Sequence, residues 1–197
     1  MAPMEMGGSI AHKTGGSTPA VVPGRECGSC TLCCKVFHVA EINKVAGKWC
    51  QHCTPGSGCA IHPTRPAQCR DFFCLWLTEP TMPPAWKPDR SKMVVSIFPL
   101  NGFIYVQVDP NAPSAWLKEP YHKQLRQWAE INLPNRRHVI VFVNDEATLI
   151  MPGQDLPLGK MKPTDGFAVR QVFGPRGPTY EVTRSDRSAP AATGPRV

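Results

Sequence analysis

The chain has 197 residues, 42% of them hydrophobic and 19% charged, which is enough for one folded domain with a small appendage. Its 22 Lys and Arg exceed its 15 Asp and Glu, so the formal net charge is +7. The sequence lacks the apolar run of about 18 residues that a transmembrane helix needs, and its first residues lack the apolar stretch of a secretory signal. We therefore expect a protein of the cytoplasm.

Before residue 90 the chain divides into three segments of different composition. Residues 1–24 are rich in Gly, Ser, Thr and Pro without apolar periodicity, which predicts a disordered N-terminal arm. Residues 25–78 hold every cysteine but few aliphatic residues, so we expect a small module that folds around metal. Residues 79–89 contain four prolines and predict a semi-rigid, extended linker.

Residues 90–173 have the pattern of a small α+β domain. Two β-rich runs flank Asn101-Gly102, a dipeptide typical of hairpin turns. After Pro120 apolar residues recur at helical spacing until Pro134, which predicts one helix there. The element order is then β-β-α-β-β. The expected strands are Met93–Phe98, Phe103–Val108, Val139–Val143 and Thr148–Met151, with Phe167–Phe173 as a further one.

The last segment, residues 174–197, returns to a composition rich in Gly, Pro and Arg. We expect it to be mostly disordered, with Tyr180–Val182 able to pair at a sheet edge. The expected fold class is therefore α+β, with a metal-nucleated Cys-rich module followed by the β-β-α-β-β domain.

The nine cysteines are the strongest functional signal in the sequence. Cytoplasmic thiols are kept reduced and an odd number cannot pair completely, so metal binding or redox chemistry is favoured over disulfides. The C-x2-C pairs Cys27/Cys30 and Cys50/Cys53 each let two thiolates of one turn reach one cation. The candidate metal ligands are Cys27, Cys30, Cys33, Cys34, Cys50, Cys53, Cys59, Cys69 and Cys74.

The adjacent pair Cys33-Cys34 bears on the number of metals. Neighbouring side chains point in different directions, so these two thiolates are poor ligands for one ion but suit two metals on either side. One tetrahedral ion also cannot use nine thiols. We expect two zinc or iron ions per chain, or one iron–sulfur cluster, because thiolate ligation suits either.

Several basic residues lie beside the cysteines in the sequence. Arg65 and Arg70 are expected to donate hydrogen bonds to metal-bound sulfurs, which would offset negative charge. Lys35 could do the same or face solvent. His52 and His62 could replace a thiolate, but the surplus of cysteines favours surface or packing histidines.

These motifs resemble the CxxCxxCC cysteine-cluster family, whose YkgJ-like members are described as zinc- or iron-chelating proteins; a relative is found in flagellin lysine methylation. The resemblance covers residues 27–76 and rests on the blocks Cys27–Cys34, Trp49-Cys50, Gly58–His62 and Arg65–Phe72. It implies chelation by the cluster and leaves open whether Cys53 or Cys74 is the eighth ligand. The family often has Tyr where this chain has His62. The ligands that it implies are Cys27, Cys30, Cys33, Cys34, Cys50, Cys59 and Cys69.

The sequence contains no Walker A run, G-x-S-x-G, H-E-x-x-H or Rossmann fingerprint, so it does not identify an enzyme. We expect a protein that chelates zinc or iron through about eight thiolates. Two alternatives stay open: an iron–sulfur protein with redox or methyl-transfer-type activity, and a structural zinc adaptor that binds protein or nucleic acid. Nucleic acid is the weaker partner, because the basic residues are dispersed and only Arg136-Arg137 are adjacent.

Overall fold

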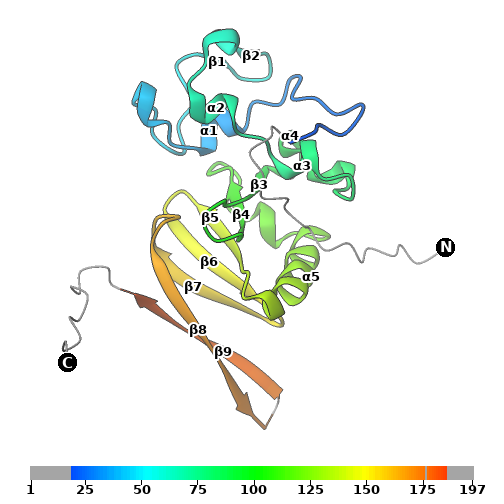
Figure 1. Cartoon of the computed structure of the whole chain (residues 1–197), viewed down its shortest axis with the longest axis vertical. Coiled ribbons are helices and arrows are strands. Elements are labelled where there is room, and N and C mark those ends of the chain that lie inside the picture. Colours follow the sequence, from blue (N-terminus) through cyan, green and yellow to red (C-terminus); the bar gives the residue numbers. More distant parts are fainter. Residues whose placement is uncertain (1–18, 176, 186–197) are drawn as a thin grey trace, which may run out of the picture.

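A five-stranded β-sheet organises the part of the chain that the structure describes, residues 19–175 and 177–185. In this computed structural model the strand order is β3-β4-β5-β6-β7, and helix α5 lies on one face of the sheet (Figure 1). The cysteine-bearing region lies at one end of the sheet, and a long hairpin projects at the opposite end. The protein is an α+β protein, as the sequence predicts.

The sheet contains the expected β-β-α-β-β order and adds an unexpected fifth strand after it, whereas the further strand expected at residues 167–173 lies in a separate hairpin. Strands β4 and β5 are parallel and the other neighbours are antiparallel. A parallel pair needs a crossover, which η4 (Ala115–Leu117) and α5 (Tyr121–Asn132) provide. The helix ends at Asn132, and η5 (Leu133–Asn135), which contains Pro134, follows it. The strands are β3 (Met93–Ile97), β4 (Ile104–Val108), β5 (Val139–Val143), β6 (Glu146–Met151) and β7 (Gln154–Lys160).

The central strand β5 is buried on both faces. Val139 and Val141 belong to the core that contains Leu125 of α5. Ile140 belongs to a second core, which contains Tyr180 of the hairpin. A strand covered on both sides needs a continuous apolar run, and this accounts for the sequence Val-Ile-Val-Phe-Val.

The projecting hairpin consists of β8 (Gly166–Gly174) and β9 (Gly177–Ser185). The side-chain amide of Gln154 fastens it to β7: Nε2 donates to the Tyr180 oxygen and the Tyr180 nitrogen donates to Oε1, both at 3.0 Å. β9 is longer than the Tyr180–Val182 edge that the sequence predicts, because it pairs with β8 along its whole length.

Two sequence expectations concern the ends of the chain. Residues 1–18 of the expected arm and residues 186–197 of the expected tail lie outside the described residues. The described end of the arm is attached to the fold, because the Val22 nitrogen donates to the Leu77 oxygen at 2.8 Å.

The proline-rich segment 79–89 is not the extended linker that its composition predicts. It contains η3 (Pro84–Trp86) and the first residues of α4 (Pro88–Ser91). Trp86 is 1% exposed, and its ring centroid lies 4.8 Å from that of Trp128 in α5. Burial of this large side chain draws the segment into the core. Pro84 and Pro88 begin η3 and α4, at first-turn positions that need no N–H donor.

The cysteine-bearing region is built from short elements joined by turns. Its helical elements have three or four residues and its two strands have two residues each. Such elements bury little apolar surface, so side-chain interactions at the centre of the region must contribute much of its stability. The elements are α1 (Cys33–Val36), η1 (Ala40–Ile42), β1 (Cys53–Thr54), β2 (Gly58–Cys59), η2 (His62–Thr64), α2 (Ala67–Arg70) and α3 (Leu75–Thr78).

Candidate metal centre

All nine cysteines precede β3 and carry free thiols. Cys27 is exposed, Cys74 is buried and the others are half-buried. They come from several turns and short helices rather than from one element, and their contacts sort them into two neighbouring groups.

The larger group surrounds Cys34, and we call it the Cys34 group. The Cys50 nitrogen donates to the Cys34 oxygen at 3.0 Å, and the charge of Cys34 contributes to the raised pKa of Cys53. Cys53 of β1 lies opposite Cys59 of β2 in the antiparallel pairing of these two strands. The Cys34 group contains Cys33, Cys34, Cys50, Cys53, Cys59 and Cys69.

Three thiols of the Cys34 group, those of Cys34, Cys53 and Cys69, have a raised pKa. A hydrogen bond with Cys33, together with burial, raises the pKa of Cys34 well above its usual range. Burial, followed by the charge of Cys34, raises the pKa of Cys53 to about 12. Burial also raises the pKa of Cys69. These thiols therefore stay protonated near neutral pH until a cation displaces their protons.

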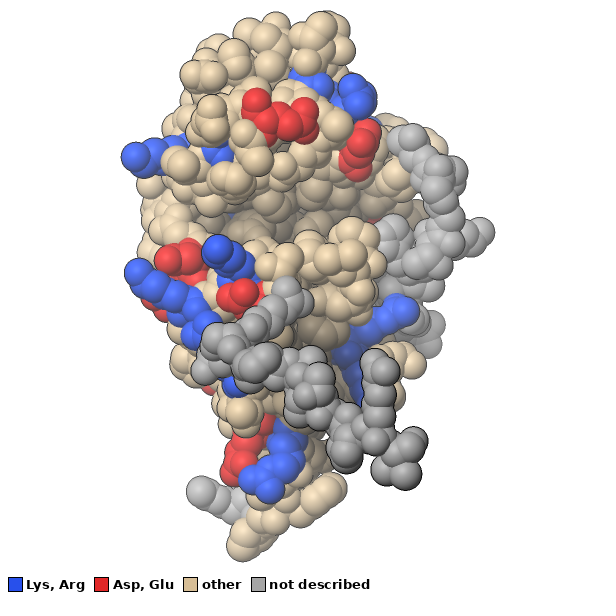
Figure 2. All heavy atoms as spheres, turned by 60° about the vertical axis from the view of Figure 1, so that its left-hand side comes forward, with Lys and Arg blue, Asp and Glu red and all other residues tan. Residues whose placement is uncertain are grey.

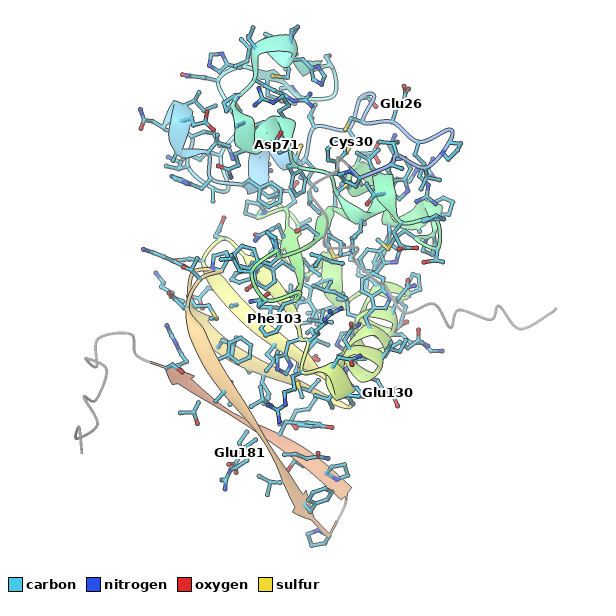
Figure 3. All side chains as sticks on the ribbon, in the orientation of Figure 1. Glu26, Cys30, Asp71, Phe103, Glu130 and Glu181 are labelled. Carbon is cyan, nitrogen blue, oxygen red and sulfur yellow. The ribbon has the colours of Figure 1, made fainter. Side chains whose placement is uncertain are left out.

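The smaller group contains Cys27, Cys30 and Cys74, and we call it the Cys27 group. The Cys30 nitrogen donates to the Cys27 oxygen at 2.7 Å, which closes the turn of the C-x2-C pair. Cys30 lies next to the segment that carries α3 and α4 (Figure 3). Burial, with the charges of Cys27 and Cys30 acting in the same direction, raises the pKa of Cys74 to about 11.

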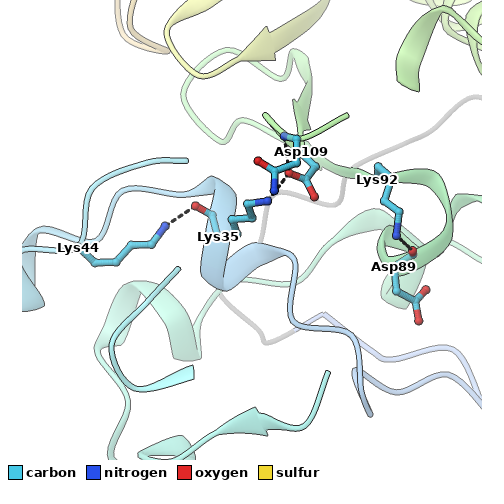
Figure 4. Close-up of polar contacts among 6 residues, drawn as sticks. Lys35, Lys44, Asp89, Lys92 and Asp109 are labelled. Atoms are coloured by element: carbon cyan, nitrogen blue, oxygen red, sulfur yellow. Dashed lines mark hydrogen bonds and ion pairs between the residues drawn. The ribbon is translucent and has the colours of Figure 1, made fainter. Parts of the chain in front are cut away.

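Lys44 lies beside the Cys34 group, a position that the sequence did not indicate. It is 6% exposed, and its Nζ donates to the Lys35 oxygen at 2.6 Å and to the Phe37 oxygen (Figure 4). Burial lowers the pKa of Lys44, whereas negative charge on Cys50 and Cys34 opposes this. No local motif signals this residue, because only the turn after α1 places it against the cysteines.

The three basic residues singled out in the sequence have different surroundings. Arg65 contacts His62, and its charge opposes the effect of burial on the pKa of Cys69. Arg70 faces solvent, with its side chain 60% exposed. Lys35 is buried and bound to Asp109 instead of to a sulfur atom.

The two histidines named as alternative ligands lie at the periphery. His52 Nε2 lies 3.2 Å from the side-chain nitrogen of Gln51. His62 is exposed next to Arg65. These surroundings are those expected of surface histidines.

Thiols supply the soft donor atoms that zinc, iron–sulfur clusters and Cu(I) prefer, so the residues present fit such a metal. As they stand, however, the described side chains include no group of three or more His, Cys, Asp or Glu arranged to hold a metal ion. Metal-dependent folding of this region is therefore a prediction.

The surface and the helices give little indication of other ligands. On the face in Figure 2, basic and acidic side chains lie next to each other rather than in a patch of one sign. Over residues 19–175 and 177–185, no helix has the length and apolar character needed to cross a bilayer.

Comparison of the chain with protein-family models, curated proteins and solved structures gives no match. The resemblance to the cysteine-cluster family therefore stays a prediction from the motifs.

Proposed function

We propose that this protein chelates zinc or iron through its cysteines, with two ions per chain. The observation that carries the proposal is the assembly of nine free thiols from separate turns at one end of the sheet. The resemblance to the CxxCxxCC cysteine-cluster family supports it. The cytoplasm is the proposed compartment, because its reducing conditions keep thiols available for metal.

Metal would also stabilise the region that binds it. The small core there consists of Leu32, Val36, Cys74, Leu77 and Val94, and one of these residues belongs to β3. A structural zinc contributes on the order of 10 kcal/mol to folding. We therefore expect the cysteine-bearing region to lose its structure when metal is removed.

An iron–sulfur cluster with redox or methyl-transfer-type chemistry is the second candidate. The run Cys27, Cys30 and Cys33 has the C-x2-C-x2-C spacing found in bacterial ferredoxins, which favours it. A zinc adaptor for a protein partner is the third, and it would hold its ion without exchange.

The test is metal analysis combined with an absorption spectrum of the full chain purified without oxygen. About two zinc or two iron ions per chain without acid-labile sulfide would support the proposal. Iron with equimolar sulfide and a broad visible band would replace it with the iron–sulfur candidate. If the purified protein holds no metal and takes up neither zinc nor ferrous iron, metal chelation is wrong.

A matched pair of variants separates chelation from folding. Cys33→Ser removes a thiol of the Cys34 group, whereas Ser57→Ala changes an exposed hydroxyl in the same region. Only the first should lower the metal content.

A further inference from the structure

We infer that Cys53 and Cys59 form an oxidation site, at which hydrogen peroxide joins the two thiols in a disulfide. The consequence for metal rests on the proposed function and deepens it, because both residues belong to the Cys34 group. Their linkage removes two thiolates from that group, so the metal held there is released by peroxide and bound again after reduction. The disulfide itself does not require a metal and is measured separately.

The turn between β1 and β2 places the two cysteines opposite each other. Pro55 and Gly56 occupy its central positions, and a backbone hydrogen bond of 2.9 Å closes it. Gly56 has a φ of 77°, so these are the residues that a type II turn requires. The Gly56 nitrogen also donates to Thr31 Oγ1 at 3.1 Å, which anchors the turn. The turn sets the strand register, and in this register Cys53 pairs with Cys59.

The backbone hydrogen bonds put this pair at the closer of the two spacings in an antiparallel ladder. The Ala60 nitrogen donates to the His52 oxygen at 2.8 Å and encloses the pair. The Cys53 nitrogen donates to the Cys50 oxygen instead of to Cys59. In such a non-hydrogen-bonded pair the Cα atoms lie about 4.5 Å apart and both side chains leave on the same face. A disulfide needs Cα atoms about 4.4–6.8 Å apart, so the backbone already has a suitable spacing.

Solvent reaches this hairpin. The turn residues 54–57 are exposed, and both cysteines are half-buried. An open hollow in the surface adjoins the second strand, and it is lined by Thr54, Ser57, Gly58, Cys59 and Ala60. A molecule as small as hydrogen peroxide can therefore approach Cys59 from solvent.

The reaction of the pair with hydrogen peroxide is balanced. One sulfur attacks the peroxide, the O–O bond breaks, and a sulfenic acid and one water form. The other sulfur displaces the hydroxyl group of the sulfenic acid, which forms the S–S bond and a second water. Two electrons pass from the sulfurs to the peroxide. The two protons come from the thiols, or from solvent where a sulfur was bound to metal. Redox-sensing disulfides of the cytoplasm are transient in this way.

The test treats the full chain, loaded with zinc, with equimolar hydrogen peroxide and maps its disulfides by mass spectrometry. Free thiols are alkylated with one reagent, and thiols released by reduction are alkylated with a second reagent. Fragment spectra of the unreduced peptides assign the partners. In wild type, Cys53 and Cys59 should carry the second label and be joined to each other. The matched control is Cys50→Ser, which removes the neighbouring thiol of the C-x2-C pair and should still form this disulfide.

Zinc release is followed in the same samples with a chromogenic chelator. Peroxide should lower the zinc content of wild type by about one ion per chain, and a thiol reductant with added zinc should restore it. Zinc that stays bound while the disulfide forms would overturn the release of metal.

The disulfide map decides the oxidation site. If peroxide joins Cys53 to Cys50 or to another cysteine, or leaves Cys53 and Cys59 with the first label, the assigned pair is wrong. If wild type takes up no metal, the proposed function fails, whereas a disulfide between Cys53 and Cys59 in that protein still supports the oxidation site.

Discussion

The Lys35 ammonium lies 2.5 Å from the Asp109 carboxylate, although the two residues are 74 positions apart (Figure 4). Lys35 belongs to α1 and directly follows Cys34, and Asp109 directly follows β4. Their side chains are only 5% and 13% exposed. This buried ion pair sets the position of the Cys34 group relative to the sheet.

Loss of one partner of this pair should be strongly destabilising. Lys35→Met leaves the Asp109 carboxylate buried without its counter-charge, so we expect the free energy of unfolding to fall by about 3–5 kcal/mol. Urea denaturation checks this. The matched control is Lys160→Met, which removes an ion pair with exposed side chains (74% and 61%) and should cost less than about 1 kcal/mol. Equal losses in both variants would contradict the prediction.

Arg25→Lys should loosen the segment after Cys74. Lysine keeps the charge but cannot bind four carbonyl groups, so we expect a loss of about 2 kcal/mol and faster hydrogen exchange in residues 76–82. Arg170→Lys, at a side chain that is 76% exposed, is the control. Unchanged exchange in Arg25→Lys would mean that the Arg25 guanidinium does not hold this segment in place.

His138 should make stability depend on pH. Burial lowers its pKa below the usual 6.5, and its ring packs between those of Phe103 (5.0 Å) and Phe167 (5.5 Å). As the pH falls below 6.5, His138 becomes protonated in the unfolded chain before it does so in the folded chain. Protonation therefore favours the unfolded state, and the free energy of unfolding decreases as the pH falls.

The measurement is urea denaturation at pH 7.5 and pH 5.5 for wild type, His138→Gln and His38→Gln; these pH values are chosen to bracket about 6.5. Wild type and the variant at the exposed His38 should lose more stability on acidification than His138→Gln. The same loss in all three proteins would rule out His138 as the cause.

Metal uptake near neutral pH should release protons. Burial raises the pKa of Cys74 to about 11 and that of Cys53 to about 12, so both thiols are protonated before a metal binds. We expect about one proton per thiolate ligand. Calorimetric titration with zinc in buffers of different ionisation enthalpy counts these protons, and Cys34→Ser should release about one fewer. An observed enthalpy independent of the buffer would contradict this prediction.

The sequence alone determined the order of the main elements, because local patterns specify them. The continuous apolar run Val139–Val143 and the helical spacing after Pro120 appear in the structure where they were expected. The sequence did not predict strand β7, because Pro157 and Gly159 are unfavourable in strands. In the structure, pairing with β6 stabilises this strand. The candidate ligands also came from the sequence, since cysteine chemistry and spacing are local properties.

Only the tertiary structure decided which thiols are neighbours. Cys74 lies with Cys27 and Cys30 because Arg25 binds carbonyl groups 51 to 57 residues further along the chain. Lys44 was equally invisible in the sequence, since its position results from the turn after α1. Such contacts join residues far apart in the chain, so short-range spacing carries no signal of them.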